Sequence, residues 1–583
     1  MNLQTLVDSL LTNTLDVSIP QYWPELALCI TIVVLLLVRV FKGGEHIPSF
    51  LLALVGSVVA LWLALPREGL SSWSEIGRQE LFTGMLVYDS LTAYIRVFLL
   101  SFAVLFIILS RLTGIADRED GQDYYVLVLG ATLGMSIMAS ANHLLTIFLG
   151  VEMASVPSYV LSGIVKGRRR SSEAALKYAI YGAGAAGVML YGISLLAGIL
   201  GSAHLPTMAR ELAAMDIPMM LQTGDEKTLM VLVLGGLMMG VGLAFKLSAV
   251  PFHFWCPDVF EGASAEVDAF LSVASKGAAL ALLLRVGIGF GYVADEPQVS
   301  SVEHEPPAAI VAVSVEASDA VSVVSIDSAD ELPLVPTQAP VLNSGSEIAG
   351  GPLAPVRRFF VVLIAVVAGI TCTFGNLAAY GQTNIKRMLA YSTIAHAGYM
   401  MMAAAAAVAL LGRDAEQLHN AIAALLFYIA IYLFMNLGAF AIVAFLRNAM
   451  QSEEIADYAG LIRSCPMTVV MMTAILVSLV GLPPLAGFWP KLRVFQALYV
   501  AGGPLMIVLL IVAGLNTVIS LVYYIRVAKT MCIDAEPDSR GPVSLGILPA
   551  AYVLVVSLPV IVLGILPDGL AQWAQEAAKH LLS

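Results

Sequence analysis

Residues 242–285 read GLAFKLSAVPFHFWCPDVFEGASAEVDAFLSVASKGAALALLLR, and this stretch decides how the chain folds. It places two lysines, Lys246 and Lys276, inside otherwise apolar sequence of helical length, and Pro251 and His253 follow Lys246 closely. In a water-soluble protein these lysines would make a poor core. In a bilayer an ionisable group at helix depth is costly and by default marks a functional site. Whether the rest of the chain lies in water or in a bilayer decides between these two interpretations of the lysines.

The composition of the chain indicates a membrane protein. Of its 583 residues, 59% are hydrophobic and 12% are charged, and the mean hydropathy is +0.86, whereas a soluble protein carries roughly a quarter charged residues. The five cysteines are scattered without a CxxC pair, which argues against an iron–sulfur cluster, a zinc site or a disulfide framework. A net charge of -12 does not suit nucleic-acid binding, and no Walker A loop supports nucleotide binding. We expect no metal and no cofactor in this chain.

Fourteen apolar runs approach or exceed the roughly 20 residues that a helix needs to cross a bilayer. We expect helices, because only helices and closed barrels satisfy the backbone in hydrocarbon and these runs are too long for barrel strands. The predicted fold is therefore an all-α polytopic membrane protein with spans at 25–41, 47–65, 90–110, 124–141, 143–163, 175–200, 229–262, 266–292, 358–378, 388–411, 419–446, 467–502, 504–526 and 545–566.

Two of these runs are longer than one membrane thickness, and both contain proline. Pro251 lies in 229–262 and Pro483 in 467–502, so each run is predicted to be a broken helix. Interrupted spans at matching places in two halves point to a transporter site. The sequence PFHFWCP follows the first break and LAGFWP the second, which favours two five-helix repeats. Because five is odd, consecutive repeats would be inverted in the membrane.

The expected organisation follows from these repeats. Helices 1–3 occupy residues 1–123, the first repeat 124–292, the second repeat 357–526, and a last helix with a tail 527–583. Residues 293–356 contain ten acidic residues and no Lys or Arg, so we expect an exposed, flexible insertion there.

The cationic residues of the short loops predict the orientation. They cluster after the fifth, ninth and thirteenth spans, as Lys166, Arg168, Arg169, Arg170, Lys386, Arg387, Arg526 and Lys529. If both termini face the other side, all of these lie on one side, which is then cytoplasmic. Arg357 and Arg358 are exceptions to this rule.

Several ionisable residues lie at membrane depth and are candidates for a proton path. They are Glu152, Lys177, Lys246, Lys276, His396 and Lys491, with His253 and Lys386 as further candidates. A buried lysine is pushed towards neutrality by desolvation and back towards charge by a nearby carboxylate. A lysine whose glutamate partner can approach or withdraw is therefore a switchable proton-binding site.

Simpler interpretations stay open for some of these residues. Lys177 and Lys386 lie near helix ends, where a lysine can extend to the interface. His253 and His396 can equally be packing residues. Asp89 and Asp258 are expected to cap or terminate helices.

Five stretches of the sequence resemble the antiporter-like membrane subunits of respiratory complex I, the proton-pumping NADH–quinone oxidoreductase. They are SSEAALKYAIYGAGAAGVMLYG (171–192), FKLSAVPFHFWCPDVFEGA (245–263), FLSVASKGAA (270–279), GNLAAYGQTNIKRMLAYSTIAHAGY (375–399) and GLPPLAGFWPK (481–491). One related subunit type typically has Glu at the place of Lys491, and another continues into a long lateral helix, for which this chain has no room. The chain departs from the family at Pro490, where Gly is more usual, and in its long insertion.

The resemblance implies a role for each candidate residue. Glu152 would pair with Lys246, and Lys177 would modulate that pair. Lys276 would continue the relay, with His396 between the halves. Lys491 would pass the proton towards the exit.

The resemblance also implies a translocase subunit without redox chemistry of its own. NADH, FMN, iron–sulfur clusters and quinone would lie on partner subunits. The partners would include a neighbouring antiporter-like subunit and small membrane subunits in the inner membrane. Two alternatives remain: a subunit of a multi-subunit cation/proton antiporter, and a non-pumping assembly subunit whose buried charges only hold helices together.

Overall fold

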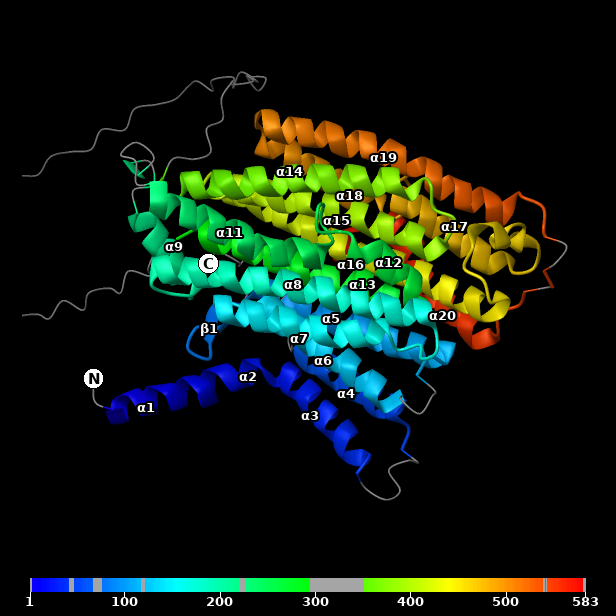
Figure 1. Ribbon diagram of the computed structural model, residues 1–583, viewed down its shortest axis with the longest axis horizontal. Coiled ribbons are helices and arrows are strands. Elements are labelled where there is room, and N and C mark those ends of the chain that lie inside the picture. The colour runs from blue at the N-terminus through cyan, green and yellow to red at the C-terminus, as the bar shows by residue number, and fades with distance from the viewer. Residues whose placement is uncertain are drawn as a thin grey trace, which may run out of the picture.

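The computed structural model describes residues 3–40, 47–66, 76–116, 121–215, 217, 219–220, 226–293, 351–537, 540–541 and 543–579. Within these ranges the chain is helical apart from one antiparallel hairpin, β1 (Gln79–Leu81) and β2 (Leu86–Tyr88). Most of the long helices run side by side along one direction (Figure 1). The predicted all-α membrane fold is confirmed.

The first helices form an arm beside the main bundle (Figure 1). A continuous helical stretch ends at Tyr22, where the chain bends by 80° into the next helix. The first elements are α1 (Leu3–Thr12), η1 (Asn13–Ser18), α2 (Ile19–Gln21), α3 (Trp23–Val38) and α4 (Ser49–Ala64), and α5 (Ser90–Thr113) follows inside the bundle, where it packs against α6, α13 and α16.

The remaining helices build the bundle and the segments that connect its ends. Up to the insertion they are α6 (Gly121–Ser140), α7 (Leu144–Ser162), α8 (Arg169–Leu200), α9 (Leu205–Ala214), α11 (Glu226–Leu247), α12 (Trp255–Gly262) and α13 (Ala265–Gly291). After it come α14 (Ala354–Ala379), α15 (Ile385–Leu410), α16 (Ala415–Met450), η4 (Ile455–Tyr458), η5 (Leu461–Arg463), α17 (Pro466–Val480), α18 (Phe488–Ala501), α19 (Gly503–Cys532), α20 (Ile547–Ile565) and α21 (Asp568–Lys579).

The helices that could span a membrane are fewer in the described residues than the fourteen spans predicted. Among the described residues, 11 helices are long and apolar enough to cross a membrane, or 12 if the bent pair before and after Tyr22 forms one span. Each of the fourteen predicted ranges coincides with a helix or a broken pair of helices. The count of fourteen and the inverted relation of the repeats stay predictions. Most of the predicted insertion, 294–350, lies outside the described residues, and α14 begins at Ala354, ahead of the predicted boundary at 357.

Both predicted breaks are present. The first separates α11, which ends at Leu247, from α12, which begins at Trp255. The second separates α17, which ends at Val480, from α18, which begins at Phe488. The last carbonyl groups of a helix have no partner within the helix, so each break leaves backbone acceptors inside the protein.

Three helices form the centre of the bundle and others face outwards. The most apolar 18-residue window of α15 is 100% buried, and those of α13 and α16 are 94% buried, whereas those of α8, α11 and α20 are 33% buried. The outer helices carry exposed Leu, Val and Ile, as expected for surfaces that contact lipid. Both breaks lie next to the buried centre, because α11 packs against α13 and α18 packs against α15 and α16.

Candidate functional site

Lys246 lies in the last turn of α11, immediately before the first break. Its side chain is buried, and its Nζ donates a hydrogen bond of 3.0 Å to Ser155 Oγ on α7. Ser155 lies one turn after Glu152 on the same helix, and its own hydroxyl donates to the Val151 carbonyl. Glu152 is half-buried, and no ion pair within 4.0 Å joins it to Lys246. The structure therefore places the predicted pair on neighbouring helices with a serine hydroxyl at the lysine.

Lys276 reaches the same break from the central helix α13. Its Nζ donates a hydrogen bond of 3.1 Å to the carbonyl of Leu247, the last residue of α11 and the neighbour of Lys246. This carbonyl is one of the acceptors that the end of α11 leaves without a helical partner. One backbone position thus links the two predicted relay lysines.

Lys491 lies in the first turn of α18, immediately after the second break. Its buried Nζ donates to the carbonyls of Leu479 and Val480 at the end of α17, at 2.9 and 2.8 Å. The ammonium group also lies 4.5 Å from the ring centre of Tyr399 on α15, within the range of a cation–π contact. Pro490, the departure from the family pattern, sits in the first turn, where helices accept proline without losing a hydrogen bond.

His396 lies in the middle of α15 among tyrosines. Its Nδ1 is 2.9 Å from the hydroxyl of Tyr428, and its Nε2 is 3.3 Å from that of Tyr524. Its ring centre is 6.1 Å from that of Tyr399, which in turn contacts Lys491. Both ring nitrogens of the histidine are therefore within hydrogen-bond distance of tyrosine hydroxyl groups. Tyr399, on the same helix, connects it to Lys491 at the second break.

Lys177 on α8 forms ion pairs with two carboxylates. Its Nζ is 2.8 Å from Asp258 on α12 and 2.9 Å from Glu173 on its own helix, and the side chain is 36% exposed. Asp258 also accepts from Arg387 at 2.8 Å. No hydrogen bond or ion pair joins Lys177 to Glu152 among the described residues, so the predicted modulation has no direct contact to act through. Asp258, expected to cap a helix, holds two cations together.

The two further candidates differ in their surroundings. Lys386 is buried and donates to the Ala263 carbonyl at 2.6 Å, and it forms an ion pair of 3.0 Å with Glu453. Its ammonium group is therefore paired inside the protein at the start of α15 and is not exposed. His253 packs edge-on against Phe374 at 4.4 Å, and its Nδ1 is buried without a hydrogen-bond partner in the described part of the chain.

The sequence reasoning missed two carboxylates on α13. Glu266 and Asp268 are both fully buried. Glu266 pairs with Arg447 at 3.3 Å, whereas both carboxylate oxygens of Asp268 lack a partner in the described part of the chain. Asp268 lies eight residues before Lys276 on the same helix. The sequence does show two acidic residues in the first turn of an otherwise apolar run. Acidic residues are common at the start of a helix, so these two did not indicate a buried site.

A second missed feature is a pair of buried salt bridges. Arg285 holds Asp89 through both guanidinium nitrogens, at 2.9 and 3.0 Å, and Arg96 holds Glu25 at 2.7 Å. Asp89 also accepts from the Thr92 amide at the start of α5, so the expected helix cap is confirmed. In the described ranges, no group of three or more His, Cys, Asp or Glu side chains could hold a metal ion.

The fold and the site define a class of protein. The chain is a polytopic membrane protein with two broken helices, and buried lysines at both breaks bind the backbone or a hydroxyl. Such an arrangement is typical of membrane subunits that move ions.

Comparisons with known proteins assign the family. The model of the family described as "NADH:quinone oxidoreductase/Mrp antiporter, TM" matches residues 141–298 and 351–519. NADH-quinone oxidoreductase subunit N of an Anaeromyxobacter species is 33% identical over 95% of this chain and 96% of its own length. Subunit N 2 of Sorangium cellulosum is 37% identical over 88% and 89%. The chain therefore belongs to the family of NADH:quinone oxidoreductase/Mrp antiporter membrane subunits, and the resemblance seen in its sequence is confirmed.

Solved structures agree with this assignment. A chain of respiratory complex I from Thermus thermophilus with bound aureothin superposes with a TM-score of 0.66 at 26% identity, over 94% of this chain and 98% of that one. A chain of the Mrp complex from a Dietzia species superposes with a TM-score of 0.69 at 18% identity, over 97% and 96%. The second likeness shows the shared fold alone.

Proposed function

We propose that this chain is a proton-translocating membrane subunit of an NADH–quinone oxidoreductase. One observation carries the proposal: Lys246, Lys276 and Lys491 are 1–3% exposed, and none has an ion-pair partner among the described residues. Each ammonium group is held only by neutral oxygens. A buried charge without a counter-charge is costly, so each lysine is a group that releases its proton when nearby charge changes.

The contacts suggest an order for the relay. Glu152 supplies a carboxylate one helical turn from Ser155, the acceptor of Lys246. Lys276 binds the carbonyl of Leu247, the residue that follows Lys246, and Lys276 lies on α13, which packs against α15. His396 and its tyrosines then lead to Lys491 at the second break.

The outer candidates take positioning roles in this proposal. Lys177, through Asp258, ties α8 to α12, and Lys386 fixes the end of α12 through the Ala263 carbonyl. Both therefore hold the segment that follows the first break. His253 lies within the break and is the candidate with the fewest contacts to the relay.

The subunit would act inside a larger complex. NADH, FMN, iron–sulfur clusters and quinone would lie on partner subunits, among them a neighbouring antiporter-like subunit and small membrane subunits. Coupling would then arrive through conformation or charge along the buried row, as a free energy shared between distant sites. The complex would lie in the inner membrane, with both termini of this chain on the non-cytoplasmic side.

The experiment that tests the proposal compares Lys246→Ala with Lys529→Ala, a change at a lysine that is 61% exposed. Proton pumping, NADH–quinone activity and assembly on a native gel are measured in membranes. We expect Lys246→Ala to assemble and to lose most coupled pumping, with Lys529→Ala near wild type. A complex that assembles and keeps both activities would make Lys246 a structural charge. Co-purification without redox subunits would favour the antiporter alternative.

A further inference from the structure

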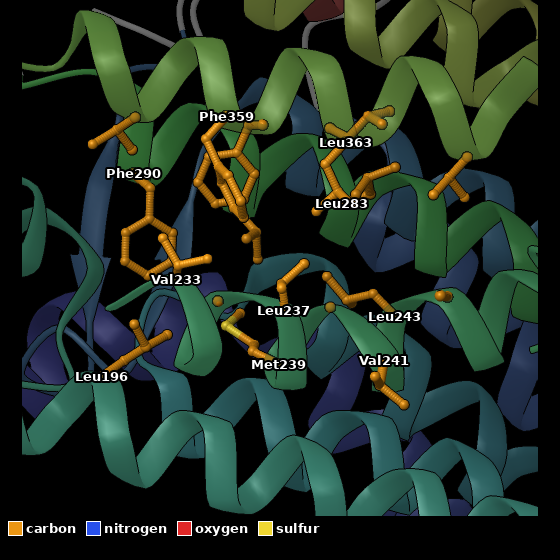
Figure 2. Close-up of a pocket in the computed structure, with 18 of the residues that line it drawn as sticks. Leu196, Val233, Leu237, Met239, Val241, Leu243, Leu283, Phe290, Phe359 and Leu363 are labelled. Carbon is orange, nitrogen blue, oxygen red and sulfur yellow. The ribbon is translucent and has the colours of Figure 1, made fainter. Parts of the chain in front are cut away.

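An apolar cavity of about 510 Å³ lies between α11 and α14, and Leu247 at the end of α11 is among its lining residues. Figure 2 shows Leu237 of α11 and Phe359 and Leu363 of α14 pointing into the same space, with Phe290 and Leu283 of α13 beside them. Both α11 and α14 pack on α13, so α13 forms the inner wall. The cavity is several times larger than the roughly 150 Å³ that an engineered apolar cavity needs to bind benzene.

The length of the cavity matches one leaflet of a bilayer. Its lining on α14 runs from Pro355 to Val367, which is about 18 Å at 1.5 Å per residue. Half of a hydrocarbon core of about 30 Å is about 15 Å. On the other wall the lining runs along α11 and continues to Val250, Pro251 and Phe252, inside the first break.

The outer edges of the cavity face lipid. Val233 and Leu237 of α11 line the cavity and are 38% and 40% exposed, and Val362 and Val366, which stand next to lining residues of α14 in the sequence, are 43% and 47% exposed. Water does not fill an apolar cavity of this kind, whereas hydrocarbon from the surrounding bilayer does so without losing hydrogen bonds. The lining therefore selects an acyl chain.

Two exposed cations stand close in sequence to lining residues, one near the start of α11 and one near the start of α14. Lys227 precedes the first lining residues of α11, and Arg358 lies between lining residues of α14. Both are exposed, and neither has an ion-pair partner in the described part of the chain. Arg357 turns inwards and donates to the Leu411 carbonyl, and Glu226 is the one carboxylate in the first turn of α11. Arg357 and Arg358 are the exceptions to the loop-charge rule, and Arg357 has a local partner in the Leu411 carbonyl.

We propose that this cavity binds one acyl chain of an anionic phospholipid, whose phosphate lies at Lys227 and Arg358. Membrane-interface Lys and Arg attract anionic headgroups, and the acyl chain extends along α11 to the first break. There it packs against Val250 and Pro251 and keeps water from the lipid-facing side of the segment that follows Lys246. This site does not depend on the proposed proton transfer.

The test uses the whole complex and variants that change either the cavity or its mouth. Gly240 lines the cavity, and a Cβ there meets no atom within 4 Å, so Gly240→Leu fills the space without a backbone clash. Gly514 on α19 is equally open and lies outside the lining, so Gly514→Leu is the matched control. The double variant Lys227→Gln with Arg358→Gln removes the charges. It also tests the site if Gly240→Leu does not assemble on a native gel.

Each complex is placed in nanodiscs of phosphatidylcholine with phosphatidylglycerol, then extracted, and its bound phospholipids are counted by mass spectrometry. We expect wild type and Gly514→Leu to keep one more phosphatidylglycerol than Gly240→Leu. The charge variant is expected to lose the preference for phosphatidylglycerol over phosphatidylcholine. Equal retention by wild type and an assembled Gly240→Leu complex would overturn the proposal. So would a partner subunit's helix seen in the cavity by electron cryomicroscopy.

Discussion

At both breaks a helix ends inside the protein and leaves free backbone carbonyl groups. Lysines bind these carbonyls at both breaks, but the number of lysines differs. At the first break two lysines divide the work: Lys276 binds the free carbonyl of Leu247, and Lys246 binds the hydroxyl of Ser155 on another helix. At the second break Lys491 alone binds two free carbonyls, those of Leu479 and Val480.

At the first break, binding of the free backbone carbonyl and the proposed proton exchange at Lys246 fall to different lysines. At the second break one lysine would have both roles. Lys246 binds no backbone carbonyl among the described residues, so it can change its charge without releasing the end of a helix. In the proposed relay Lys491 would do both, because its ammonium group also binds the two free carbonyls at the end of α17. We therefore expect a change at Lys246 to affect pumping more than stability, and a change at Lys491 to affect both.

The largest expected effect compares Lys491→Met with Lys276→Met. Both changes remove a buried ammonium group, so the gain from no longer burying a charge is common to both. Lys491→Met leaves two buried carbonyls unsatisfied and Lys276→Met leaves one, at roughly 1–3 kcal/mol each. Lys491→Met should therefore be less stable by about 1–3 kcal/mol, measured as the lower apparent Tm of complexes heated at one rate. Equal Tm values would show that the breaks do not differ in this way.

A smaller effect is expected at the serine that receives Lys246. Ser155→Ala removes one hydrogen bond, worth roughly 1 kcal/mol, which corresponds to about a fivefold change in rate. Proton pumping should fall by up to that factor while the native gel stays unchanged. Ser155→Thr keeps the hydroxyl and should restore pumping. If Ser155→Ala and Ser155→Thr pump equally well, the hydroxyl contributes nothing to the first break.

The smallest effect is expected for a residue that lies away from both breaks, and it serves as a reference for the changes made at the breaks. In the β1–β2 hairpin, a hydrogen bond from His204 lowers the pKa of Glu80. A carboxyl group with a lowered pKa stabilises the fold above its unfolded pKa, and this contribution is lost as the pH falls through the folded pKa. For a partly exposed group we expect less than about 1 kcal/mol. Glu80→Gln should therefore lower the apparent Tm slightly at neutral pH and have no effect at acidic pH. A change in pumping would connect the hairpin to the relay.

Periodicity, length and charge predicted much of this molecule. The fourteen ranges found helices because long apolar runs have one stable form in hydrocarbon. Both breaks were predicted because Pro251 and Pro483 interrupt runs too long for one span. Lys246, Lys276, Lys491 and His396 were correctly expected to be buried, and the family motifs were sufficient to assign the family.

The residues whose surroundings the sequence did not predict share one cause. Lys177 finds its partner, Asp258, 81 positions away, and Lys386 is buried by Ala263 and Glu453. Asp268 resembles a helix-terminus charge until the packing of α13 encloses it. Their surroundings come from helices distant in the chain, which a local pattern does not describe.

The sequence by itself determined the medium, the helices, the places where two of them break and the identity of the charges at depth. These follow from the cost of exposing backbone polar groups or charges to hydrocarbon, which each segment meets on its own. Only the tertiary structure decided which oxygen each lysine binds and which carboxylate stays without a partner. It also decided that α11 and α14 leave an acyl-sized space between them. Those outcomes depend on how distant helices pack, because hydrogen bonds and cavities form at distances of a few ångströms that chain order does not specify.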